Sequence, residues 1–255
     1  MIMETISRKT MLYKTGVEYG DYTMNHILGC AHGCKFPCYA FLLKRRFGII
    51  SSYEEWCKPR LVVNTLELLE KELPLLKVRI KSVHLCFSSD PFMYGYPEVE
   101  KMSLDAIELI NKFSIKCVVL TKGVLPKALA NFDKKNEYGI SLITTDENYR
   151  MRMEPGAAPL TDRVSSLYAL HKSGCKTWVS IEPYPTPNLI SQDIFQVLNT
   201  IKFVDKIIFG RTNYSKEVSS YKEHKTFYNQ CAQTVAAFCA QNNIKLHIKD
   251  GTVTE

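Results

Sequence analysis

The chain has 255 residues, enough for one large domain with a complete hydrophobic core. Hydrophobic residues make up 45% of it and charged residues 23%, which excludes a largely disordered protein, and no apolar run is long enough for a transmembrane helix. The net charge of +7 permits an anionic partner such as a nucleic acid, although no basic helix or arginine-rich stripe marks one.

Short apolar runs alternate with amphipathic segments along the whole chain. The apolar runs predict strands over residues 22–28, 82–87, 115–123, 139–144, 176–183, 205–210 and 245–250. The amphipathic segments predict helices over residues 39–47, 98–113, 161–174, 190–201 and 219–242. In the third of these helices, Thr161 is the expected N-cap and Gly174 the residue just beyond the end.

This alternation predicts an α/β fold, because parallel strands buried on both faces are apolar and β-branched. The number of strands in a chain of this length fits a single-domain partial TIM-type barrel of six to seven βα units, (βα)6–7, better than one of eight. We assign residues 1–255 to this domain, with its core at about 20–210 and a C-terminal helix and last strand at about 215–252. Polar residues follow several strands, and in such folds the functional site lies at the carboxyl ends of the strands.

Three cysteines, Cys30, Cys34 and Cys38, lie four residues apart after the first predicted strand. Thiolates are soft ligands that suit zinc or an iron–sulfur cluster. A structural zinc ion normally has four protein ligands, so His26 or His32 would have to complete a Cys3His site. A [4Fe–4S] cluster held by three thiolates instead leaves one iron free to bind a substrate or cofactor. Both alternatives remain open at this point.

The remaining cysteines are scattered and the total of nine is odd, so a disulfide framework is not expected. Their spacing also gives no indication of a second cluster. The N-terminus lacks the apolar core of a signal peptide. We therefore expect a cytoplasmic protein with reduced thiols and no membrane partner.

The three-cysteine loop in a small α/β barrel resembles the radical S-adenosylmethionine (radical SAM) superfamily, and the segment GCAHGCKFPCYA is most similar to its spore photoproduct lyase-like branch. That family usually has Cys-x3-Cys-x2-Cys, whereas this chain has Cys-x3-Cys-x3-Cys, one residue longer. The insertion displaces the aromatic residue that precedes the last cysteine. Phe36 or Tyr39 would take its place against the cofactor.

The resemblance implies two cofactors, a [4Fe–4S] cluster bound by the three cysteines and S-adenosylmethionine (SAM) on its open iron. A carboxylate with neighbouring hydroxyls suits the SAM amino group, and a lysine suits the SAM carboxylate. The resemblance places the contacts to the SAM amino group at Ser88, Ser89 and Asp90, and the contact to its carboxylate at Lys122. It places the contact to the ribose at Ser141 and the contact to the adenine at Ser180.

Four further residues are assigned to the site. Arg152 belongs to the segment RMEPGAAP, which also resembles these relatives, and with Glu154 it either binds SAM or shapes the loop. Glu182 ends an apolar strand, and a buried carboxylate needs a partner, so we place it in the site. Arg211 either pairs with Glu182 or holds an anionic substrate.

The resemblance implies that the reduced cluster cleaves SAM to methionine and a 5′-deoxyadenosyl radical, which abstracts hydrogen from the substrate. An external flavodoxin- or ferredoxin-type protein would supply the electron. Cys86 is the expected donor that returns a hydrogen atom, assisted by Tyr39. The alternative for Cys86 is a small buried strand residue, because a one-residue shift along a strand turns a side chain to the other face.

The substrate is not fixed by these motifs. The lyase-like resemblance and the positive charge favour a nucleic acid, such as a pyrimidine lesion. The lack of a recognisable DNA-binding extension favours a peptide, a protein or a small metabolite. A non-catalytic zinc-binding interaction protein is the alternative from another class.

Overall fold

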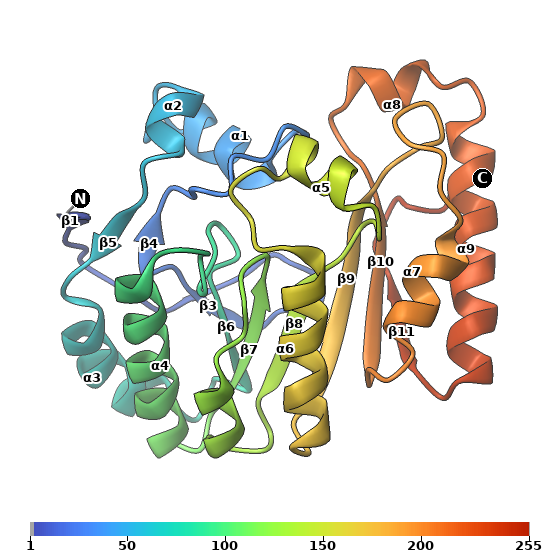
Figure 1. The fold of residues 1–255 in the computed structure, drawn as a ribbon. Helices are drawn as coiled ribbons and strands as arrows, with labels where there is room; N and C mark the ends of the chain where they lie inside the picture. The colour runs from blue at the N-terminus through green and yellow to red at the C-terminus, as the bar shows by residue number, and fades with distance from the viewer. Residues whose placement is uncertain (1–2, 255) are drawn as a thin grey trace.

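A computed structural model describes residues 3–254, and its architecture is mixed α/β (Figure 1). Within these residues seven parallel strands form the main sheet, and β2 adds to one edge in the antiparallel direction. The strands lie in the spatial order β11-β10-β9-β8-β7-β6-β3-β2. Their bounds are β2 Tyr13–Lys14, β3 Tyr22–Met24, β6 Ser82–Leu85, β7 Lys116–Thr121, β8 Glu137–Ser141, β9 Lys176–Tyr184, β10 Lys206–Arg211 and β11 Lys245–Ile248.

A second, three-stranded sheet lies on the N-terminal side, in the order β1-β5-β4. It consists of β1 (Glu4–Ile6), β4 (Ile27–Leu28) and β5 (Arg60–Val62), with β1 parallel and β4 antiparallel to β5. The sequence patterns did not reveal β1, β2 or β5, because each has only two or three residues.

The helices fall into two groups in Figure 1. Long helices such as α4, α6 and α9 run alongside the sheet, while α1, α2, α5 and α8 lie beyond the carboxyl ends of the strands. Their bounds are α1 Tyr39–Arg46, α2 Tyr53–Trp56, α3 Thr65–Leu76, α4 Pro97–Lys112, the 3-10 helix η1 Lys127–Asn131, α5 Glu147–Met153, α6 Leu160–Lys172, α7 Ile194–Thr200, α8 Lys216–Ser220 and α9 His224–Gln241.

The main hydrophobic core lies between the sheet and its flanking helices. Strand residues such as Val119 and Ile140 pack there with helix residues such as Ala106, Leu167 and Val235, and all five are buried. Burial of these side chains is the main source of stability in such a fold. The predicted α/β class with a parallel sheet is confirmed, and the sheet is open between β2 and β11 within residues 3–254.

Three predicted boundaries are wrong. The helix predicted at 161–174 begins at Leu160, and its N-cap position is Pro159 rather than Thr161, although Gly174 follows its end with φ +75° as expected. The helix predicted at 219–242 is two helices, because the chain leaves helical geometry between α8 and α9. The strand predicted at 22–28 is broken into β3 and β4, which lie in different sheets.

The break between β3 and β4 has a physical cause in long-range hydrogen bonds. The Asn25 Oδ1 accepts bonds from the backbone N–H and the hydroxyl of Ser88, at 2.9 and 2.8 Å. The carbonyl of His26 accepts from the backbone N–H of Val62 at 2.9 Å, which directs β4 onto β5. The chain therefore leaves the main sheet just before the cysteine loop and carries that loop over the strand ends.

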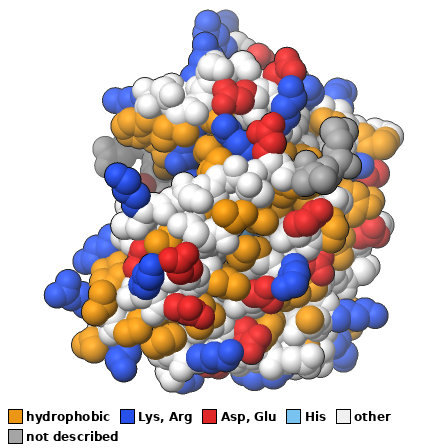
Figure 2. Space-filling model, turned by 90° about the vertical axis from the view of Figure 1, so that its left-hand side faces the viewer, with side chains coloured by type: hydrophobic (Ala, Val, Ile, Leu, Met, Phe, Trp, Pro, Cys, Tyr) orange, Lys and Arg blue, Asp and Glu red, His pale blue; other side chains and the backbone are white. Residues whose placement is uncertain are grey.

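The face of the molecule in Figure 2 mixes basic, acidic and hydrophobic side chains. Ion pairs at i,i+4 spacing occur on two of the helices, between Lys71 and Glu67 on α3 and between Lys101 and Asp105 on α4. Within residues 3–254, no helix combines the length and the apolar character that crossing a bilayer requires.

Candidate active site

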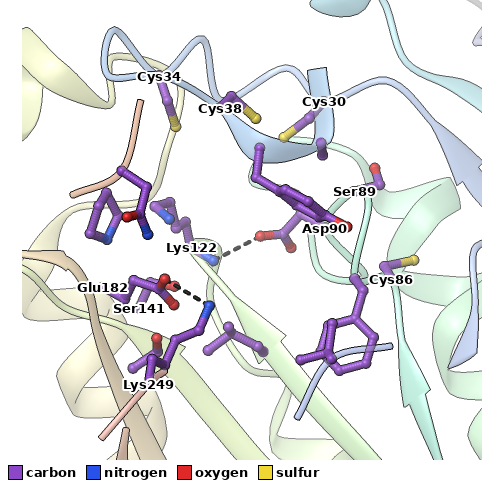
Figure 3. A pocket seen from close by; sticks show the side chains of 18 of the residues that line it. Cys30, Cys34, Cys38, Cys86, Ser89, Asp90, Lys122, Ser141, Glu182 and Lys249 are labelled. Atoms are coloured by element: carbon purple, nitrogen blue, oxygen red, sulfur yellow. Dashed lines mark hydrogen bonds and ion pairs between the residues drawn. The ribbon is translucent and has the colours of Figure 1, made fainter. Parts of the chain in front are cut away.

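A cavity of about 630 Å³ opens at the carboxyl ends of the strands, under the cysteine loop (Figure 3). The sequence-predicted site residues that line it are Cys30, Cys34, Phe36, Cys38, Tyr39, Cys86, Ser89, Asp90, Lys122, Ser141, Ser180 and Glu182. Three predicted residues, Ser88, Arg152 and Glu154, do not line it. The cavity therefore gathers residues from the cysteine loop and from the ends of β6, β7, β8 and β9.

Helix α2 anchors one side of the cysteine loop. The backbone N–H of Cys30 donates to the carbonyl of Trp56 at 2.9 Å, and the hydroxyl of Tyr53 donates to the carbonyl of Cys34. The N-cap Ser52 of α2 accepts from the backbone N–H of Glu55, which fixes the start of this short helix. The backbone of the loop is thus held at two points by a helix that follows it in the chain.

The segment after α5 anchors the other side of the loop. The backbone N–H of Lys35 donates to the carbonyl of Met153 at 2.8 Å, and that of Gly156 donates to the carbonyl of His32 at 2.9 Å. A Cβ on Gly156 would lie 2.3 Å from the carbonyl oxygen of Ala31, so only glycine permits this close approach. The EPGA segment acts here as a clamp on the cysteine loop.

The three thiols lie along the top of the cavity with their sulfur atoms directed into it (Figure 3). Burial raises the pKa of the Cys30 thiol well above its ordinary value and that of Cys34 to about 12. A metal that binds here must displace these protons. Three soft donors beside a roomy cavity fit an iron–sulfur cluster. Among residues 3–254, no three His, Cys, Asp or Glu side chains group tightly enough to hold a single metal ion, whereas the three thiolates of a [4Fe–4S] cluster would each bind a different iron.

Asp90 ties together the ends of β6 and β7. Its Oδ1 accepts from the hydroxyl of Thr121 at 2.6 Å and from the backbone N–H of Phe92 at 2.9 Å. Its Oδ2 accepts from the backbone N–H of Lys122 at 2.8 Å and lies 3.5 Å from Nδ1 of His32. Much of the acceptor capacity of this carboxylate is therefore already used, and a ligand ammonium group would have to share it.

Lys122 reaches the cavity from the end of β7 and faces a buried carboxylate. Its Nζ lies 3.7 Å from Glu154 Oε1 and 5.5 Å from the ring centroid of Phe36. Burial alone would lower the pKa of Lys122, but the negative charge of Glu154, joined by that of Cys34 once its thiol is ionised, outweighs burial and raises this pKa. Lys122 therefore stays cationic, as contact with an anionic group requires.

Glu154 itself is almost fully buried, with 2% of its side chain exposed, and so is its partner Arg163 at 1%. Their Oε2 and Nη1 atoms lie 2.8 Å apart, and Arg163 also donates to the carbonyls of Ala158 and Ser141. Since Glu154 does not line the cavity, the geometry favours the alternative in which it shapes the loop. Arg152 is exposed on α5, where its guanidinium lies 5.2 Å from the ring centroid of Tyr149.

Ser141 and Ser180 lie side by side because β8 and β9 pair in register at these two residues. Both are buried in the strands and line the cavity. The bond that Arg163 donates to Ser141 goes to its backbone carbonyl and not to its hydroxyl. Two neighbouring hydroxyls that face a cavity can donate and accept hydrogen bonds with a polar ligand such as a sugar.

The far wall of the cavity contains a pair that the sequence analysis did not identify. Nζ of Lys249, just after β11, lies 2.8 Å from Glu182 Oε1, as Figure 3 shows. Arg211 instead donates from Nε to Asn213 Oδ1 at 2.9 Å, so of its two predicted alternatives the pairing with Glu182 is not observed. The only sequence signal for Lys249 was its place after an apolar strand, a signal that several polar residues share.

Cys86 and Tyr39 differ in how they face the cavity. Cys86 follows β6 with φ +60°, and its Sγ lies 3.4 Å from Nδ1 of His26. Figure 3 shows this sulfur directed away from the three cysteines above the cavity. Tyr39, the first residue of α1, is 52% exposed and lines the cavity. Ser88 faces the opposite side, where it is fixed by Asn25.

Three comparisons with known proteins bear on this site. The family model described as the Radical SAM superfamily matches residues 24–201, more than half of the chain. A protein of Acidianus two-tailed virus called uncharacterized protein ORF301 is 25% identical over 197 residues, which is 73% of this chain. The match covers 64% of the viral protein, so this chain spans less than two thirds of that relative's length.

Solved structures of spore photoproduct lyase are similar in fold. One, with bound AdoMet and dinucleoside spore photoproduct, superposes with a TM-score of 0.68 at 16% identity over 95% of this chain and 80% of that chain. Another, complexed with dinucleoside spore photoproduct, gives a TM-score of 0.67 at 15% identity with the same coverage. At such low identity the similarity concerns the fold alone.

Proposed function

This chain belongs to the radical SAM superfamily, and from that premise we propose that it is an enzyme that uses a [4Fe–4S] cluster and SAM to abstract hydrogen from a substrate. The observation that carries the proposal is the arrangement of three thiols over a cavity whose other walls hold Asp90, Lys122 and paired serines. When bound, the cluster and SAM supply reductive cleavage of the sulfonium bond, which yields the 5′-deoxyadenosyl radical.

In this proposal each wall of the cavity has its own part. Cys30, Cys34 and Cys38 hold the cluster. Ser89 and Asp90 bind the amino group of SAM, and Lys122 binds its carboxylate, opposite charges in a partly dehydrated site. Ser141 and Ser180 bind the ribose and flank the adenine, Phe36 covers the cofactor, and Glu182 lies at the substrate side. Ser88 and Arg152 do not line the cavity, and we leave them out of the cofactor contacts.

Hydrogen return is assigned to Cys86 and Tyr39, as the resemblance implies. The S–H bond of a thiol is weak, and a product radical can take its hydrogen atom. In this structure the Cys86 thiol is bonded to His26, so it would have to turn toward the cavity first. Tyr39 needs no such movement, because it already lines the cavity.

The proposed substrate is a nucleic acid with a pyrimidine lesion, supported by the fold similarity to spore photoproduct lyase and the charge of +7. Modification of a peptide, protein or small metabolite is the alternative. We further propose a lyase-type reaction, a flavodoxin- or ferredoxin-type electron donor, a cytoplasmic location, and one domain over residues 1–255 built as a partial TIM-type barrel. The open sheet of parallel strands supports the last of these.

Anaerobic reconstitution with iron and sulfide tests the cofactor assignment. We expect bound iron and sulfide, a broad visible absorbance, and release of 5′-deoxyadenosine from SAM under dithionite. Cys34→Ala should abolish that release, whereas Cys57→Ala, a matched change outside the cavity lining, should retain it. Protein that binds zinc but never assembles a cluster would overturn the enzyme proposal, and release by Cys34→Ala would overturn the ligand assignment.

Isotope labelling tests the hydrogen donor. In deuterated buffer an exchangeable donor returns deuterium to the product, so wild-type protein should give a labelled product. Cys86→Ala should lose the label or accumulate a product that lacks the returned hydrogen. Unchanged turnover and labelling in Cys86→Ala would remove Cys86 from the mechanism and leave Tyr39 as the candidate.

A further inference from the structure

A second pocket, of about 530 Å³, adjoins the candidate active cavity on the side of α1 and β2. The two hollows share part of their lining, at Thr15, Gly16, Val17, Tyr39 and Phe87. A ligand long enough to pass these residues can therefore occupy both. Of the sequence-predicted site residues, only Tyr39 and Ser88 line the second pocket, and Tyr39 lines both. The proposed cofactor contacts therefore give the second pocket no role.

The second pocket is lined by four cations and by no acidic side chain: Arg8, Lys9, Lys14 and Lys44. None of the four has a carboxylate within ion-pair distance in the described part of the chain. Burial and then the nearby charge of Arg8 lower the pKa of Lys44. Like charges held together in a hollow without a counter-charge favour the binding of an anion.

Aromatic rings stand next to these cations. Tyr13 is 41% exposed and Tyr39 52%, and both line the pocket with Phe87. The Tyr13 hydroxyl accepts a bond from the Asn25 amide, which leaves its own proton free to donate into the pocket. Exposed rings interleaved with lysine and arginine are the pattern of single-stranded nucleic-acid grooves, where bases stack and phosphates pair with cations.

We propose that this basic pocket binds the phosphodiester backbone of a single-stranded or locally unpaired nucleic acid, with a base stacked on Tyr13 or Tyr39 and the neighbouring base delivered to the main cavity. The inference rests on the proposed function and adds the surface that binds the backbone of the proposed nucleic-acid substrate. Enzymes that act on a base must take it out of the duplex stack, and the backbone then needs its own binding surface.

The size of the two hollows supports a strand rather than a small anion. Each is larger than a single phosphate group, at about 630 and 530 Å³, and their shared lining makes one continuous path. A free phosphate would use one or two of the cations and none of the aromatic rings. A strand uses both kinds of group at once, which is the arrangement that the pocket offers.

Fluorescence anisotropy with a labelled single-stranded oligonucleotide tests the inference on the purified full chain. The double variant Lys14→Gln/Lys44→Gln should bind roughly tenfold more weakly, and each lost contact should reduce the slope of log K against log salt by about 1. The matched control Lys71→Gln/Lys101→Gln removes the same charge from exposed ion pairs on α3 and α4 and should bind like wild type.

Two outcomes would overturn the inference. One is an equal loss of oligonucleotide affinity in the two double variants, which would show that only the net charge of the protein matters. The other is a mononucleotide, used as competitor, that binds as tightly as the oligonucleotide, which would assign the pocket to a small phosphorylated metabolite. Release of 5′-deoxyadenosine by wild-type protein is measured separately, so failure of the proposed radical chemistry is distinguishable from failure of strand binding.

Discussion

The two walls of the main cavity are built very differently. Behind the lining on the side of the cysteine loop, Glu154 and Arg163 form an ion pair that is almost fully buried, and Asp90, after β6, is bonded to the end of β7. On the side of β10 and β11, the Glu182–Lys249 pair is 19% and 26% exposed, and Tyr214 beyond it is 75% exposed. The first wall is fixed before any ligand binds, whereas the second is accessible to solvent.

The two walls differ in how firmly their charged groups are held before a ligand binds. A cofactor with a fixed shape benefits from charges that are already in place, because no reorganisation is then required at each turnover. A substrate that enters and leaves needs an accessible wall. We therefore propose that the loop-side wall binds the cofactor and that the β10–β11 wall, together with the basic pocket, binds the substrate.

The largest expected effect is at the loop-side wall, from Glu154→Gln. It leaves Arg163 without its buried partner, and loss of one member of a buried ion pair typically costs about 3–5 kcal/mol of unfolding free energy. Denaturant unfolding measures this loss. Glu67→Gln, which removes an exposed pair on α3, is the control and should cost less than about 0.5 kcal/mol. Equal losses would contradict the contrast.

The opposite end of the sheet gives the next largest effect, with a pH dependence. Burial alone would raise the pKa of Glu137, but bonds from Lys116 and Lys206 outweigh it and lower this pKa to about 2. A lowered folded-state pKa means that the stabilisation is complete above the unfolded value near 4.5 and disappears as the pH falls toward 2. The difference in stability between wild type and Glu137→Gln should be roughly 2–3 kcal/mol at pH 6.

Unfolding curves at pH 6 and pH 3 provide the measurement for Glu137. The difference between the two proteins should shrink at pH 3, because the carboxyl of Glu137 is then protonated in the unfolded chain but still largely ionised in the folded protein, so protons favour unfolding. A difference that grows on acidification would show that the two lysine bonds do not control this carboxylate.

An intermediate effect is expected where the clamp meets the cysteine loop. Gly156→Ala places a Cβ 2.3 Å from the Ala31 carbonyl oxygen, so the loop must move, at a cost of roughly 1–3 kcal/mol. Iron content after reconstitution should fall in parallel with stability. The control Gly16→Ala meets nothing within 4 Å and should change neither quantity. Full iron loading by a destabilised Gly156→Ala protein would separate the clamp from the metal site.

The smallest expected effect is on the accessible wall. Glu182→Gln removes a pair that solvent already reaches, so stability should fall by about 1 kcal/mol or less. Measurement beside Glu154→Gln under identical conditions makes the comparison direct. If Glu182→Gln costs as much as Glu154→Gln, both walls are fixed in the same way and our division between cofactor and substrate sides is wrong.

The sequence by itself determined the local features of this protein. Alternating apolar and amphipathic runs predicted the parallel strands β6 to β11 and their helices, because each period is set by neighbours within one element. The regular spacing of Cys30, Cys34 and Cys38 and the polar strand ends predicted where the site lies. These signals depend only on residues close together in the chain.

Tertiary structure alone decided which side chains meet. Asn25 ends β3 through Ser88, Lys249 rather than Arg211 pairs with Glu182, and the thiol of Cys86 turns to His26. Each of these contacts joins residues at least 60 positions apart. Such pairs have no local signature, because strand order, register and one-residue shifts in direction, not sequence distance, bring them together.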